Sequence, residues 1–133
     1  MKILIFICLF ISMQTIASNN ILICKVIESK DTTGDGLHQE TEFSKLYLGK
    51  KFTLNKDSGE MNGGVSNHNA SGKPQILDHG NTQQNFKAIT VYEPYVTIDL
   101  IQISHSKNKN NQSSFLFVSG TKTMSGLCSK LNE

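Results

Sequence analysis

Two cysteines near opposite ends of the chain, Cys24 and Cys128, place the strongest constraint on its fold. A third, Cys8, lies in an apolar segment that we expect to be removed on export, so a single pair remains. In an oxidising compartment such a pair most simply forms a disulfide. No CxxC spacing or flanking histidine supports the alternatives, a metal pair or a reactive thiol. The sequence therefore predicts a disulfide that joins the first strand to the last.

The first 17 residues have the three parts of a secretory signal peptide: a lysine, an apolar run from Ile3 to Ile11 and small residues at the end. Thr15 and Ala17 suit the positions before a cleavage site, so we expect cleavage before Ser18. A membrane span needs roughly 20 apolar residues, and neither this run nor any later segment is long enough. We therefore expect residues 18–133 to form one secreted or periplasmic domain without a membrane span.

Short apolar runs separated by turn residues predict a mostly β domain. In the clearest run, Lys51 to Asn55, Phe52 and Leu54 alternate with polar residues, and a turn follows at Lys56 to Gly59. Further β-rich runs lie at 21–27, 86–92, 95–104, 114–119 and 121–128. We expect an all-β fold, a small antiparallel barrel or sandwich of about seven or eight strands with at most one short helix.

The run at 95–104 changes its apolar face. Ile98 and Leu100 share one face of an extended chain, whereas Ile101 and Ile103 share the other. This pattern predicts either a bulge near Leu100 or a strand that is buried on both sides.

The composition gives no electrostatic signal for nucleic acid or for an anionic membrane. The formal net charge is +2, with 13 basic and 11 acidic residues. The chain also contains no arginine, the usual bidentate ligand of phosphate groups. Proteins that bind nucleic acid usually concentrate basic residues on one face, so we expect no nucleic-acid partner.

Motifs for zinc binding and for nucleophilic catalysis are absent from the sequence. The four histidines form neither an HxH nor an HExxH pair, which zinc sites use; they are His38, His68, His79 and His105. There is no GxSxG motif, and the paired cysteines leave no thiol nucleophile. We therefore expect a protein that is not an enzyme and that carries no cofactor.

A twelve-residue segment is similar to an EF-hand calcium loop. Oxygen side chains stand at its positions 1, 3, 5 and 12, supplied by Asp31, Thr33, Asp35 and Glu42. Position 8 is His38, where an aliphatic residue is usual, and the preceding segment is expected to be a strand rather than a helix. We therefore favour a polar turn without a metal and keep the calcium site as an alternative.

Three residues around Pro94 form the candidate ligand surface. Tyr92, Glu93 and Tyr95 are expected at the tip of a loop between two strands. Exposed tyrosines beside a rigid proline offer a large contact area at low entropic cost. Packing of the tyrosines at the strand ends is the alternative.

In outline the chain is similar to small exported bacterial β domains that tie a first-strand cysteine to a last-strand one, some of which inhibit host lysozymes. The similarity covers architecture only, and architecture alone does not assign function. We expect a monomeric, exported, non-enzymatic domain that binds an unknown protein or small ligand through its loops, as an inhibitor or effector. The alternatives are a structural or envelope-associated protein without a discrete site, and a calcium-binding module at 31–42.

Overall fold

Antiparallel strands make up nearly all the regular structure of the computed structural model, which describes residues 20–131. The predicted signal peptide, residues 1–17, and its cleavage site before Ser18 lie outside the described residues. In chain order the elements are β1 (Ile21–Thr32), β2 (His38–Gln39), α1 (Glu42–Lys45), β3 (Lys51–Asn55), β4 (Met61–Gly63), β5 (Pro74–His79), β6 (Phe86–Tyr92), β7 (Thr97–Lys107), β8 (Ser113–Ser119) and β9 (Lys122–Lys130).

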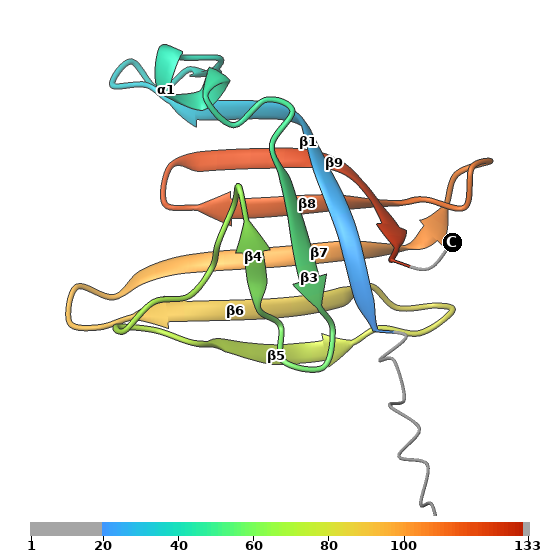
Figure 1. Ribbon diagram of the computed structural model, residues 1–133. Coiled ribbons are helices and arrows are strands. Elements are labelled where there is room, and N and C mark those ends of the chain that lie inside the picture. Colours follow the sequence, from blue (N-terminus) through green and yellow to red (C-terminus); the bar gives the residue numbers. More distant parts are fainter. Residues whose placement is uncertain (1–19, 132–133) are drawn as a thin grey trace, which may run out of the picture.

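The strands form one curled sheet, a half-barrel (Figure 1). Eight strands follow one another in the order β4-β3-β1-β9-β8-β7-β6-β5, and the short β2 pairs with the end of β1. The all-β expectation is confirmed. The sheet is neither a two-layer sandwich nor a closed barrel, because β4 and β5 end the order and do not pair with each other.

A bulge in β1 divides this long strand into two parts that pair with different strands on one side. Its pairing with β9 shifts between Val26 and Glu28, and a bulge of this kind bends a strand and increases its twist. Residues before the bulge pair with β3, and residues at the far end pair with β2. The hairpin of β3 and β4 is thereby turned across the inner side of β5 and β6 (Figure 1).

Alternating apolar residues on the inner side of the sheet fill the half-barrel. Phe52 and Phe115 meet edge to face, with ring centroids 5.2 Å apart. The buried apolar residues are Cys24, Val26, Phe52, Leu54, Met61, Val65, Phe86, Ala88, Ile101, Ile103, Phe115, Phe117, Met124 and Cys128. The interior is therefore packed rather than hollow, so ligand binding must use the surface or the ends of the sheet.

The disulfide between Cys24 and Cys128 is present, as predicted. The two residues face each other in the register of β1 and β9 and are separated by 104 positions in the sequence. Both are buried in the core. The bond therefore locks the pairing of the first and last described strands.

Strand β7 has apolar residues on both faces and no bulge near Leu100. Its pairing with β8 is regular from Asp99 to Ile103, and the register shifts only between Ile103 and Lys107. Of the two alternatives, the bulge near Leu100 is therefore wrong. Ile101 and Ile103 point into the core, whereas Leu100 lies half-buried on the outer face.

Asn67 joins the β4 edge to the turn that precedes it. Its side-chain oxygen accepts a hydrogen bond of 2.8 Å from the Met61 backbone N–H, and its side-chain nitrogen donates to the Gly59 carbonyl at 2.9 Å. A Cβ on Gly59 would lie 3.1 Å from Ala88 and 3.2 Å from Pro74, so this turn packs directly onto β5 and β6. A buried amide thus satisfies backbone groups that strand pairing leaves open.

Candidate functional site

The loop between β6 and β7, residues 93–96, projects from one end of the sheet (Figure 1). Its Glu93–Pro94 peptide bond is cis, and the Glu93 backbone N–H donates to the Ser71 carbonyl at 3.0 Å. Val96 has a φ of 51°, which is rare for a β-branched residue. Such strain persists only where the surrounding structure imposes it, and it is concentrated at functional sites.

The three candidate residues line the same hollow, but their structural roles differ. Tyr92, Glu93 and Tyr95 line a cavity of about 510 Å³ at this end of the sheet. The side chain of Tyr95 is 89% exposed, whereas Tyr92 is half-buried. Tyr95 is therefore the aromatic residue that is free to contact a partner, and whether it does so stays a prediction.

Tyr92 is fixed by a carboxylate that the sequence did not single out as part of this surface. Its hydroxyl donates a hydrogen bond of 2.7 Å to Oδ2 of Asp99, a β7 residue that is only 7% exposed. Burial raises the pKa of the Tyr92 hydroxyl, and the hydrogen bond to Asp99 raises it further. Tyr92 consequently stays neutral and serves to hold the start of the loop.

Acidic and uncharged polar residues line the hollow. Glu93 and Asp99 contribute carboxylates, and no lysine or histidine of the described chain lines it. The remaining lining residues bring amides, hydroxyls and backbone: Asn69, Ser71, Thr97, Ser119 and Gly120. These residues come from the β4–β5 connection, from β7, and from the end of β8 and the turn after it, so local patterns could not group them. The one local signal was Asp99, a carboxylate on the same strand face as Ile101 and Ile103.

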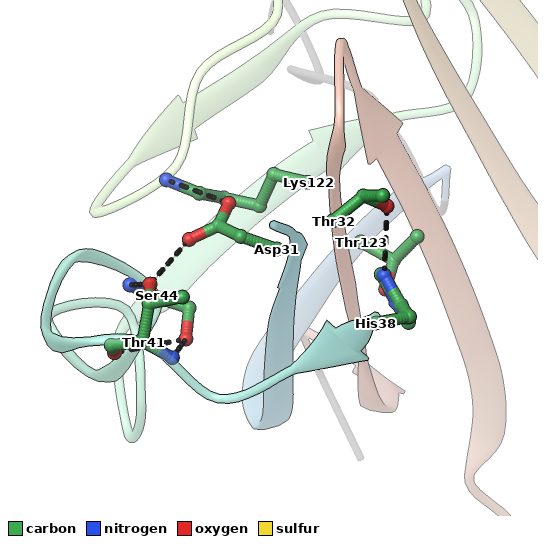
Figure 2. A network of polar contacts seen from close by, with 7 residues as sticks. All are labelled: Asp31, Thr32, His38, Thr41, Ser44, Lys122 and Thr123. Carbon is green, nitrogen blue, oxygen red and sulfur yellow. Dashed lines mark hydrogen bonds and ion pairs between the residues drawn. The ribbon is translucent and has the colours of Figure 1, made fainter. Parts of the chain in front are cut away.

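Asp31, Thr33 and Glu42, three of the four candidate calcium residues, have other partners, and Figure 2 shows those of Asp31. Asp31 accepts a hydrogen bond of 2.6 Å from the Thr41 hydroxyl and lies 4.0 Å from the Lys122 ammonium. Glu42 begins α1 and forms an ion pair of 2.9 Å with Lys45. The Thr33 hydroxyl donates to the Leu37 carbonyl, and Asp35 lies in the exposed turn.

A polar network organises this segment (Figure 2). His38 lies between the hydroxyls of Thr32 and Thr123, at 3.2 Å and 2.7 Å. Thr41 and Ser44 form a capping box that begins α1. Within residues 20–131, no three side chains of His, Cys, Asp or Glu gather to hold a metal ion.

Comparison of the chain with family models, with curated proteins and with solved structures gives no match. In the described part of the chain, no helix has the length and apolar character needed to cross a membrane.

Proposed function

We propose that this protein is an exported, non-enzymatic domain that binds a partner protein through the β6–β7 loop. The observation that carries the proposal is the position of Tyr95, a side chain 89% exposed on a strained loop beside an acidic hollow. Aromatic side chains with this placement dominate the binding energy of many protein interfaces. Where the bound domain covers the surface with which the partner performs its own activity, binding makes it an inhibitor or an effector of that partner.

The chemistry of the hollow favours a partner segment that combines an apolar group with a lysine or an arginine. Glu93 and Asp99 supply negative charge, and no basic residue of the described chain lines the hollow. Tyr95 is 89% exposed although it lines the hollow, which suits insertion into a pocket of a partner more than enclosure of a small ligand. The hydrogen bond between Tyr92 and Asp99 keeps the loop preorganised, which reduces the entropic cost of binding.

Export is supported by two features. The disulfide between Cys24 and Cys128 is consistent with an oxidising compartment outside the cytoplasm. Residues 1–17 have the pattern of a signal peptide. A secreted or periplasmic location is therefore part of the proposal.

The test compares three immobilised proteins: the wild type, Tyr95→Ala and Phe43→Ala. Phe43 is the matched control because it is another exposed aromatic residue, on α1 at 75% exposure, away from the hollow. Secreted and envelope proteins of the producing cells are passed over each, and retained proteins are quantified by mass spectrometry. We expect a partner that the wild type and Phe43→Ala retain and that Tyr95→Ala loses.

The interaction is then measured by calorimetry with the purified partner. We expect at least about a tenfold loss of affinity for Tyr95→Ala, the usual size of an aromatic hot spot, and weaker binding at high salt. Equal retention by all three proteins would favour the structural or envelope-associated alternative, which makes no use of Tyr95.

A further inference from the structure

A second, larger cavity opens at the opposite end of the sheet, where β6 begins and β7 ends. Its volume is about 540 Å³, within the usual range for small-molecule sites. Its floor is apolar and is made by Leu22, Phe86, Ile103 and the buried Cys128. The cavity thus lies over the edge of the packed core and beside the disulfide.

The rim of this cavity is basic. Lys56, Lys107, Lys130 and His105 line it, whereas no Asp or Glu in the described part of the chain does so. Asp57, which follows Lys56, accepts a hydrogen bond of 2.7 Å from the Asn20 side chain and is not part of the lining. The charge is therefore opposite to that of the Tyr95 hollow, which carries two carboxylates and no lysine.

Two of these lysines are held in place by contacts with other lining residues. The Lys56 ammonium lies 5.6 Å from the centroid of the Phe86 ring, so a positive charge stands directly above the apolar floor. The Lys107 ammonium donates to the Asn111 side-chain oxygen at 2.9 Å, which uses one of its three N–H groups. Both cations are thus partly ordered before any ligand arrives.

His105 is also oriented by its neighbours. Its backbone N–H donates to Oδ1 of Asn85 at 2.9 Å, which identifies that atom as an acceptor. The same atom lies 2.8 Å from Nδ1 of His105, so Nδ1 carries a proton, and Nε2 lies 3.4 Å from the Ser106 hydroxyl oxygen. The imidazole is consequently a fixed polar group at the rim.

We propose that this cavity binds a small amphiphilic anion, with a carboxylate or phosphate headgroup and a short apolar chain. The headgroup would be held by Lys56 and Lys107, and the chain would lie on Phe86 and Ile103. Charge-assisted hydrogen bonds from ammonium groups are the strong contacts for such a headgroup. The apolar floor explains why the ligand needs a chain as well as a charge.

Calorimetry with the purified protein at low ionic strength tests this with four probes: octanoate, octyl phosphate, inorganic phosphate and octyltrimethylammonium. We expect octanoate and octyl phosphate to bind at one site, and the tighter of the two identifies the headgroup. Inorganic phosphate should bind at least about tenfold more weakly because it cannot cover the apolar floor. Backbone NMR shifts should change at Leu22, Phe86 and Ile103.

The variant Lys56→Gln/Lys107→Gln should lower the affinity for octanoate and octyl phosphate at least about tenfold, because charge-assisted hydrogen bonds are lost. The control Lys25→Gln/Lys73→Gln makes the same change in net charge at two exposed lysines outside the cavity and should bind like the wild type. Lys56→Arg/Lys107→Arg keeps both charges and should retain binding, which separates a lost site from a misfolded protein.

Three results would overturn the proposal: octyltrimethylammonium shifting the same amide signals with equal affinity, inorganic phosphate binding as tightly as octyl phosphate, or an unchanged affinity in the glutamine variant. Tyr95→Ala should bind octanoate like the wild type because Tyr95 is at the other end of the sheet. The failure of one proposal can therefore be told from the failure of the other.

Discussion

The hydroxyl of Thr90 donates a hydrogen bond of 2.7 Å to the backbone carbonyl of Asn67, and both residues are buried. Thr90 belongs to β6, whereas Asn67 lies in the connection that leaves β4. Since the Asn67 side chain also binds the backbone of Gly59 and Met61, this one residue links the β4 end of the sheet to β6. The half-barrel is thus bridged by a buried amide where strand pairing stops.

Replacement of Asn67 by Ala should therefore destabilise the fold strongly. The substitution leaves the Met61 N–H and the Gly59 carbonyl buried without their partner. Each such group costs about 1–3 kcal/mol of unfolding free energy. Urea unfolding measures the loss, and Asn62→Ala on the exposed face of β4 is the control. Equal stability of the two variants would contradict the bridging role.

Gly126→Ala should also destabilise the protein, by about 1–3 kcal/mol or more, because the core has no room for a methyl group there. A Cβ at this position would overlap the Lys25 carbonyl and lie 2.8 Å from the Phe115 ring. Gly34→Ala is the matched control, since nothing lies within 4 Å of its Cβ position. The melting temperatures of the two variants are compared with that of the wild type. An unchanged melting temperature for Gly126→Ala would contradict this prediction and show that β9 can shift away from β1.

The double variant Cys24→Ser/Cys128→Ser should lose about 2–5 kcal/mol of unfolding free energy. The bond closes a loop across 104 positions, and its removal enlarges the unfolded ensemble. A reductant should lower the stability of the wild type under unfolding conditions and leave the double variant unchanged. Detection of two reactive thiols in the native protein would be the contrary result.

The burial of Tyr92, together with its hydrogen bond to Asp99, should make stability depend on pH in the alkaline range. The folded pKa of Tyr92 is raised above its unfolded value of about 10, so its contribution is complete below about pH 10 and is lost as the pH rises further. The stability difference between the wild type and Tyr92→Phe should therefore shrink from pH 9 to pH 11. A constant difference over that range in urea unfolding would refute this linkage.

Calcium should not raise the melting temperature. A site with a Kd near ~10⁻⁴ M would add about 2.7 kcal/mol at ~10 mM ion, a shift of several degrees. We expect no shift because Asp31 and Glu42 are bonded to Thr41 and Lys45 rather than to a common point. Glu42→Gln should behave like the wild type with calcium or with chelator. A calcium-dependent shift that this variant abolishes would restore the loop as a metal site.

The sequence allowed the disulfide and the strand-rich class to be predicted because both depend on simple patterns. One pair of cysteines remains outside the predicted signal peptide, near opposite ends of the chain, and runs such as Lys51 to Asn55 alternate with period two. The curl of the sheet could not be predicted from such patterns, because it depends on the β1 bulge and on Asn67. Asn67 lies in a stretch rich in glycine, serine and asparagine, which is typical of an exposed loop.

The two cavities differ in how far they could be predicted. Tyr92 and Tyr95 stand together in the sequence, so their surface was visible as a local pattern. Lys56, Lys107 and Lys130 are far apart in a chain with nearly balanced charge, and only the folded sheet brings them to one rim. Each of them lies at or just beyond the end of a strand, a weak signal that could have marked one end of the sheet.

The place of β9 in the sheet also determines when this protein can fold. β9 lies between β1 and β8, so the first described strand lacks its principal neighbour until the last one has been synthesised. Pairings between distant parts of a chain form late, because loop closure must come first. A chain emerging from the ribosome therefore cannot complete this sheet until β9 has been synthesised. Cys24 and Cys128 can meet only afterwards, when the first and last described strands are both present to pair.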